Sequence, residues 1–176
     1  MNKFKIKKIG QDVIKLESMA LAKLSKSLNG DFVKAVELIY GLNGKIIISG
    51  VGKSGNIAGK IAASFTSTGI PAIYLNPVDA SHGDMGIIDK NDVLMILSNS
   101  GETHELTDLI NFIKKKKLKI ISITSSNKSL LSKNSDINLI IPYHLEADKL
   151  QTIPTTSTTM CLALGDALCC SVLSLR

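Results

Sequence analysis

Residues 50–55, GVGKSG, place a cation and a hydroxyl in a glycine-rich turn directly after an apolar run. Lys53 and Ser54 would stand at the start of a helix, where free backbone N–H groups and the helix dipole favour a bound anion. The glycines have the G-x-G-x-x-G spacing of dinucleotide-binding turns: Gly50, Gly52 and Gly55. Such folds carry an acidic residue about 20 residues further on, where none stands here, and Ile47 occupies the position of the first Walker A glycine. The turn therefore favours a smaller anion over a nucleotide, with an ordinary strand-to-helix turn as the alternative.

Two further segments, SNSGET at 98–103 and PTTSTT at 154–159, are rich in hydroxyl groups and precede predicted helices. Hydroxyls and free backbone N–H groups at helix starts can bind phosphate oxygens, although they also serve as simple helix caps. Three such segments at one edge of a sheet favour a pocket for a phosphate monoester. The candidate phosphate and substrate ligands are Gly52, Ser54, Gly55, Ser98, Asn99, Ser100, Gly101, Glu102, Thr103, Thr156, Ser157 and Thr158.

Short apolar runs separated by helical patterns are the elements that must position these segments. Five runs predict strands: KIIIS, PAIYL, DVLMILS, LKIISIT and INLIIP. The predicted helices between and after them are 55–68, 103–116, 129–133 and 156–175. Strands that are apolar on both faces and joined by helices form parallel sheets with right-handed crossovers. Ligands of such sheets bind at the carboxyl ends of the strands, which is where all the polar, glycine-rich segments fall.

Two helices are expected before the sheet. Apolar residues recur at helical spacing from Ile9 to Leu28, and DFVKAVELIYGLNG predicts a second helix capped by Asp31 and closed by Gly41 or Gly44. We expect one structural domain overall. Its helices within residues 1–43 would pack on the domain or on other subunits, and residues 44–176 would form the α/β unit.

Composition narrows the possible partners. The net charge of +6 is concentrated in the first eight residues and in the lysines at 114–117, with almost no interleaved Arg or aromatic residues, so a solvated surface is favoured over a nucleic-acid site. Three cysteines, Cys161, Cys169 and Cys170, lack the spacing of a metal site. No apolar signal core and no uninterrupted run of 18 apolar residues is present, so a cytoplasmic protein without metal or membrane contact is expected.

Four segments together resemble the sugar isomerase (SIS) domain family from about residue 10 onward: GVGKSG, ASHGDMG, SNSGETHE and PTTSTTMCLALGDAL. SNSGET marks the superfamily, whereas ASHGDMG with the last segment is specific to its arabinose-5-phosphate isomerase branch. The resemblance implies a three-layer αβα sandwich with a five-stranded parallel sheet, usually tetrameric. It also implies interconversion of D-ribulose 5-phosphate and D-arabinose 5-phosphate, in the 3-deoxy-manno-octulosonate (Kdo) pathway of lipopolysaccharide synthesis, without an organic cofactor.

Such a reaction needs a base that removes a proton beside the carbonyl and returns it to the neighbouring carbon of an enediol. Glu146 and Glu105 are the carboxylates available in the predicted loops, and a cation or imidazole can stabilise the enediolate oxygens. The resemblance implies catalytic roles for Lys53, Glu105 and Glu146 and a substrate contact for His82. We expect Glu146 to shuttle the proton, Glu105 and Lys53 to polarise or orient the substrate, and His82 to grip the sugar.

Each of these residues also has a purely structural interpretation. Glu105 in the first turn of a helix complements the dipole, and Lys53 could be a solvated lysine at a helix start. Glu146 lies in a loop, where many glutamates have no role, and His82 could cap a turn.

Two departures from the family pattern stand in the sequence. Longer members continue into a segment with an active-site histidine and a pair of CBS modules, whereas the printed sequence ends at Arg176. The loop after Glu146 reads ADKLQTI, where the family more often has a Cys-Pro pair. The alternatives that stay open are a 6-phospho-3-hexuloisomerase, a sugar-phosphate-binding module without turnover and, last, a dinucleotide-dependent oxidoreductase.

Overall fold

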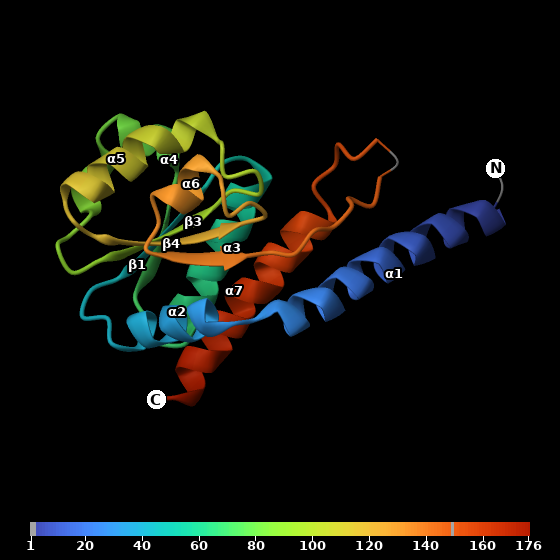
Figure 1. Ribbon diagram of the computed structural model, residues 1–176, viewed down its shortest axis with the longest axis horizontal. Helices are drawn as coiled ribbons and strands as arrows, with labels where there is room; N and C mark the ends of the chain where they lie inside the picture. Colours follow the sequence, from blue (N-terminus) through green and yellow to red (C-terminus); the bar gives the residue numbers. More distant parts are fainter. Residues whose placement is uncertain (1–2, 149) are drawn as a thin grey trace.

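The computed structural model describes residues 3–148 and 150–176 and shows an α/β fold in three layers (Figure 1). Its sheet has five parallel strands in the order β2-β1-β3-β4-β5. The strands are β1 (Ile46–Gly50), β2 (Ala72–Leu75), β3 (Val93–Leu97), β4 (Lys119–Thr124) and β5 (Ile137–Ile140). The predicted fold class and all five predicted strands are confirmed.

The central strands are buried on both faces because helices cover the sheet above and below. In β1, Ile46 and Ile48 pack into one apolar cluster, whereas Ile47 packs into the other. The alternation follows from the two-residue period of a strand. The register pairs Gly50 at the end of β1 with Leu97 at the end of β3, so the loops that follow these two strands begin at the same level.

The helices are divided between the two faces of the sheet. One face carries α1 (Lys3–Ser27), α2 (Gly30–Tyr40), α3 (Lys53–Ser67) and α7 (Thr156–Ser174). The other carries α4 (Pro77–Ser81), α5 (Thr107–Lys115) and α6 (Leu130–Lys133), with the short 3₁₀ helices η1 (Asp84–Ile87) and η2 (His104–Leu106) nearby (Figure 1). The chain therefore leaves β1 toward one face and β3 toward the other. A topological switch point between these two strands is the expected place for a ligand.

Local details differ from the sequence-based prediction at three points. The cap of α2 is Asn29, whose side-chain oxygen accepts a hydrogen bond from Asp31 N at 2.9 Å, so the prediction of Asp31 as the cap was wrong. The helix expected from Thr103 begins with η2, and regular α-helix starts only at Thr107. The short helices α4 and η1, of five and four residues, were not predicted.

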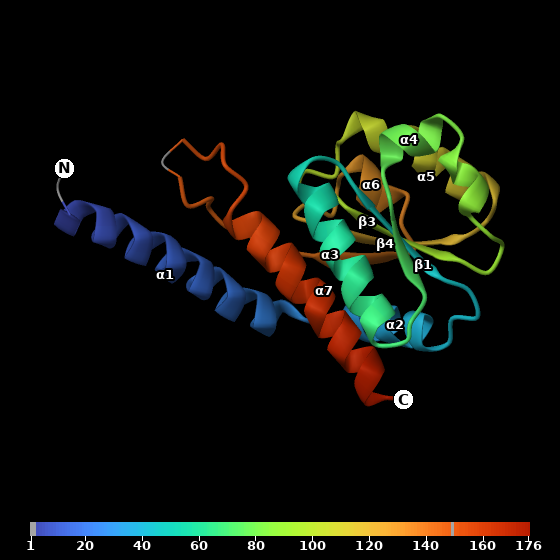
Figure 2. The same cartoon turned by 180° about the vertical axis from the view of Figure 1, so that it is seen from behind.

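The first helix, α1, extends well beyond the body of the domain (Figures 1 and 2). Six of its apolar residues form one stripe along the helix, which we call the α1 stripe: Ile6, Ile9, Val13, Leu16, Ala20 and Leu24. Ala20 and Leu24 are buried in the core shared with α7, whereas Ile6 and Ile9 are exposed because no part of the described chain covers that end. The stripe is thus continuous, but only its second half packs on the chain's own domain.

By length and composition alone, α7 is the one helix of the described residues that could cross a membrane. Half of its most apolar window is nevertheless buried inside the domain. It packs against α1, α2 and α3 (Figure 2). This burial is typical of the core helix of a soluble protein.

The buried carboxylate of Asp92, just before β3, accepts hydrogen bonds from Lys45, just before β1. Its side chain is 1% exposed, and its Oδ1 accepts from Lys45 N at 2.9 Å. Its Oδ2 accepts from Lys45 Nζ at 2.6 Å and from Asp89 N at 2.8 Å. Burial alone would raise the pKa of Asp92, but the hydrogen bonds from Lys45 and Asp89 outweigh it and lower the pKa below its ordinary value.

Replacing Asp92 with Asn should lower the free energy of unfolding at pH 7 by about 2 kcal/mol, because an amide loses the charge-assisted bonds to Lys45. Since the pKa of Asp92 is lower in the folded than in the unfolded chain, this stabilisation is full above the unfolded value and is lost as the pH falls through the folded one. Urea unfolding at pH 3 and pH 7 measures the effect, with Glu37→Gln at an exposed position of α2 as the control. An equal difference between wild type and Asp92→Asn at both pH values would contradict the assignment.

Candidate functional site

A cavity of about 320 Å³ lies at the carboxyl ends of β1 and β3. Its walls come from the turn after β1, the start of α3, the loop after β3, the loop from β5 to α7, and the first turns of α7. This is the switch point that the strand order predicts. The sequence-predicted residues that line it are Lys53, Ser54, Asn99, Glu146, Ser157 and Thr158.

The glycine turn aims the start of α3 at this cavity. Gly52 has φ 59° and ψ −123°, a combination that side-chain-bearing residues rarely adopt. A Cβ at Gly55 would lie 2.7 Å from the carbonyl oxygen of Gly50 and 2.7 Å from the hydroxyl of Tyr74, so only glycine lets α3 pack this closely on β1. Gly52 and Gly55 thus act through the backbone and do not themselves line the cavity.

Lys53 is the first residue of α3 and is exposed at the mouth of the cavity. Within residues 3–148 and 150–176, no carboxylate pairs with its ammonium group. A lysine at the positive end of a helix dipole is unfavourable unless an anion compensates it. The side chain is therefore well placed to meet a negatively charged ligand.

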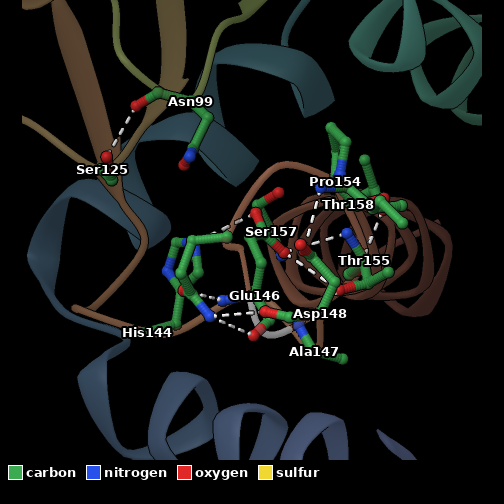
Figure 3. Close-up of polar contacts among 12 residues, drawn as sticks. Asn99, Ser125, His144, Glu146, Ala147, Asp148, Pro154, Thr155, Ser157 and Thr158 are labelled. Carbon is green, nitrogen blue, oxygen red and sulfur yellow. Dashed lines mark hydrogen bonds and ion pairs between the residues drawn. The ribbon is translucent and has the colours of Figure 1, made fainter.

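Glu146 is held at the N-terminus of α7 (Figure 3). Its Oε2 accepts from Thr155 N at 2.9 Å, from Thr155 Oγ1 at 3.1 Å and from Ser157 N at 3.2 Å. Burial alone would raise the pKa of Glu146, but donation by Ser157 and Thr155 outweighs it and lowers the pKa below its ordinary value. Glu146 is therefore a carboxylate at neutral pH and can accept a proton.

The second oxygen of Glu146 faces a buried imidazole. His144 Nδ1 lies 3.0 Å from Pro142 O, to which it donates, so Nε2 is left toward Glu146 Oε1 at 3.9 Å. The side chain of His144 is only 7% exposed. The sequence interpretation did not include His144 in the site and missed this contact. Its spacing of two residues from Glu146, which puts both on one side of an extended segment, was the available signal.

Asn99 brings the loop after β3 to the cavity. Its backbone oxygen accepts from Ser125 Oγ at 2.7 Å and from Thr124 Oγ1 at 3.1 Å, which fixes the residue against the end of β4 (Figure 3). Its side-chain Oδ1 is buried and has no hydrogen-bond partner among the described residues. A buried acceptor without a partner beside a cavity is suited to a ligand hydroxyl.

The hydroxyls of the same loop bond to one another and do not line the cavity. Ser98 Oγ and Thr103 Oγ1 are 2.8 Å apart, and Ser98 Oγ also accepts from Gly101 N at 3.0 Å. Ser100 Oγ accepts from Glu102 N at 3.2 Å. In this arrangement the hydroxyls support the turn itself, and their role as phosphate ligands stays a prediction.

Gly101 and Glu102 anchor that turn to the neighbouring loop. Gly101 has φ 70°, and a Cβ there would collide with Ser129 Oγ, so the position requires glycine. Glu102 Oε1 accepts from Leu130 N at 3.0 Å at the start of α6. Both residues are placed for structure, and neither lines the cavity.

Three other predicted site residues lie outside the cavity lining. Glu105 is exposed within η2, and His82 is exposed at the C-terminal end of α4. Thr156 is fully buried, and its Oγ1 finds no partner among the described residues. The structure thus brings Lys53 and Glu146 to one cavity, and the functional roles of Glu105 and His82 stay predictions.

The cavity also contains residues that the sequence interpretation did not assign to the site, among them Gln151, Thr152 and Cys161. Cys161 is no nucleophile, since burial first and the charge of Glu146 second raise the pKa of its thiol to about 12. Over residues 3–148 and 150–176, no three His, Cys, Asp or Glu side chains gather as metal ligands.

The sequence of this chain is similar to those of known proteins. Residues 39–171 match the family model described as SIS domain. The arabinose 5-phosphate isomerase KdsD of Yersinia pestis is 44% identical over 167 residues, which are 95% of this chain and 51% of that protein. The uncharacterized protein RP505 of Rickettsia prowazekii is 47% identical over 160 residues, 91% of this chain and 50% of that protein. The chain therefore spans about half the length of these curated relatives.

Solved structures agree with the fold. The structure of Escherichia coli CFT073 c3406 in complex with arabinose 5-phosphate has a TM-score of 0.96 at 35% identity, over 99% of this chain and 93% of that one. MJ1247 from Methanococcus jannaschii has a TM-score of 0.74 at 20% identity, over 92% of this chain and 89% of that one, which shows a shared fold alone.

Proposed function

We propose that this chain, which belongs to the SIS domain family, is a sugar-phosphate isomerase, and specifically that it interconverts D-ribulose 5-phosphate and D-arabinose 5-phosphate through an enediol. The single observation that carries the proposal is Glu146, an ionised carboxylate fixed at a cavity that Lys53 also lines. The names of the similar proteins support the substrate. A cytoplasmic location and a place in the supply of the Kdo pathway are parts of the same proposal.

Glu146 would carry the proton in both directions. From the ketose side, its carboxylate removes a proton from C1, and the electrons of the broken C–H bond form the C1=C2 enediol. The proton of the C1 hydroxyl passes to O2, and the carboxylic acid of Glu146 then returns its proton to C2. Lys53 would stabilise the negative charge that develops on the sugar oxygens during both transfers.

The phosphate would bind where the hydroxyl groups of two helix starts meet. Ser54 at the start of α3 and Ser157 and Thr158 at the start of α7 line the cavity from two sides. An anion between two helix N-termini gains from both dipoles. Of the remaining predicted ligands, Ser98 and Thr103 would first exchange their mutual hydrogen bond, and Ser100 its bond from Glu102 N, for bonds to phosphate oxygens.

The proposal is tested by incubating the purified chain with D-arabinose 5-phosphate and following formation of the ketose. Several pentose and hexose phosphates, including 6-phospho-3-hexulose, serve as competing substrates. Ketose formation from arabinose 5-phosphate, faster than from the other sugars, is the expected result. Binding of arabinose 5-phosphate without conversion at micromolar protein would instead establish a binding module, and preference for the hexulose would establish the 6-phospho-3-hexuloisomerase.

We propose that the chain forms a homo-oligomer, either a dimer or a tetramer. The exposed half of the α1 stripe supports this proposal. Replacing Ile9 with Glu puts a charge into that stripe and should weaken association by about ten-fold or more, because the apolar contact is lost and a charge is desolvated. Gln11→Glu adds the same charge on the opposite face of α1 and is the control. Light scattering over a dilution series measures the mass, and equal masses for both variants would contradict a contact through the stripe.

A further inference from the structure

We infer that Gln151 is a positioning residue that holds Glu146 in place for proton transfer. The inference rests on the proposed function and extends it to a residue outside the predicted site. Gln151 lies in the loop between β5 and α7 and lines the same cavity as Glu146.

The side chain of Gln151 forms hydrogen bonds with both polar atoms of the Glu146 backbone. Its Oε1 accepts from Glu146 N at 2.7 Å, and its Nε2 donates to Glu146 O at 2.7 Å. One carboxamide therefore satisfies the donor and the acceptor of a single residue, as a neighbouring strand would. A side chain needs both an acceptor and a donor for this pairing; glutamine has both, whereas an ionised glutamate of the same length has no donor.

The backbone of Gln151 has an uncommon conformation where its side chain makes these hydrogen bonds. Its φ is 56°, a left-handed conformation that is uncommon for any residue except glycine, asparagine and aspartate. Such conformations cost free energy and persist where the surrounding contacts determine them. The two hydrogen bonds to Glu146 are contacts of this kind.

Asp148 supplies the other anchor of Gln151. Gln151 N and Nε2 donate to Asp148 O at 3.1 and 2.9 Å. The Asp148 carboxylate in turn accepts from the backbone N–H groups of Thr152 and Ile153, which lower its pKa below the ordinary value. The loop is thus folded around its own polar groups, and Gln151 connects it to Glu146.

Together these bonds hold Glu146 from two directions. Thr155 and Ser157 fix Oε2 of its side chain, and Gln151 fixes its backbone. The carboxylate is then held at a defined place for the transferred proton. Displacement by about 1 Å is enough to slow such a transfer by up to about 100-fold.

The test compares wild type with Gln151→Met, which keeps the length of the side chain and removes all three of its hydrogen bonds. If Gln151→Met fails to fold, Gln151→Asn is used in its place. Asparagine keeps the carboxamide group on a side chain that is shorter by one methylene group. Gln11→Met on the exposed face of α1 is the matched control. Thermal unfolding of all variants verifies that each is folded.

The first measurement needs no substrate. Hydrogen exchange of the Glu146 amide, followed by NMR, should become about five-fold faster or more in Gln151→Met, because the amide loses its acceptor. The control should exchange as wild type does. An unchanged rate would overturn the contact, whether or not the chain is an isomerase.

The second measurement uses D-arabinose 5-phosphate, unlabelled and deuterated at C2. We expect kcat to fall by about 10- to 100-fold, with KM within about two-fold of wild type. The deuterium isotope effect on kcat should rise, which a smaller folded fraction would not cause. A wild-type chain without turnover overturns the proposed function, whereas an active wild type with an equally active Gln151→Met overturns the positioning role.

Discussion

Glu146→Gln should abolish isomerisation and leave the binding of the sugar phosphate almost intact. The amide oxygen of glutamine can still accept from Thr155 N and Ser157 N, so the loop and the start of α7 should keep their shape. Glutamine cannot take a proton from carbon, and the loss of a general base slows a reaction by about 10²- to 10⁴-fold. Steady-state kinetics gives kcat, and calorimetry with D-arabinose 5-phosphate gives the affinity.

Glu37→Gln, at an exposed position of α2, removes the same charge far from the cavity and should leave both quantities unchanged. The pH dependence provides a second check on Glu146. Because its pKa is lowered, its carboxylate stays ionised until the pH falls below the ordinary range of a glutamate, and the acid limb of kcat/KM should lie there. A variant that works at the wild-type rate would remove Glu146 from the mechanism.

Gly55→Ala should destabilise the protein and damage the site at once. Its new Cβ would stand 2.7 Å from the backbone oxygen of Gly50, which cannot move unless the turn from β1 to α3 opens. Overpacking of this kind costs about 1–3 kcal/mol. Opening the turn also displaces Lys53 and Ser54, so the affinity for the sugar phosphate should fall together with stability.

Gly59→Ala is the matched control, because it adds the same methyl group one turn further along α3. There the Cβ meets only the ring of Tyr74 at 4.0 Å, an ordinary contact, and alanine raises the stability of a helix interior by up to about 1 kcal/mol over glycine. Urea unfolding measures both variants. A Gly55→Ala protein as stable as Gly59→Ala would show that close packing of α3 on β1 is not required.

The sheet could be predicted from the sequence because its chemistry is local. Buried parallel strands are continuous apolar runs, and each of the five runs became a strand whose ends lie within two residues of the predicted ones. The apolar pattern could not decide whether Asn29 or Asp31 caps α2. Both are good capping residues, and the backbone conformation at Asn29 decides between them.

Site residues were predictable where they lie at the start of a helix, as Lys53 and Ser157 do, or just after a strand, as Asn99 does. The sequence shows which side chains can donate or accept, but it does not show what they meet. Ser98 and Thr103 were predicted to face a ligand, and they bond to each other. Gln151 could not be found because its role depends on a left-handed turn within an irregular loop.

The protonated state of Cys161 has a practical consequence. A buried thiol with a pKa of about 12 stays unreactive toward alkylating reagents at neutral pH, and Cys169 is buried as well. Cys170, exposed on α7, is left as the natural attachment point for a fluorophore. A dye there would leave the cavity untouched, so ligand-induced changes could be followed by fluorescence without engineering a new cysteine.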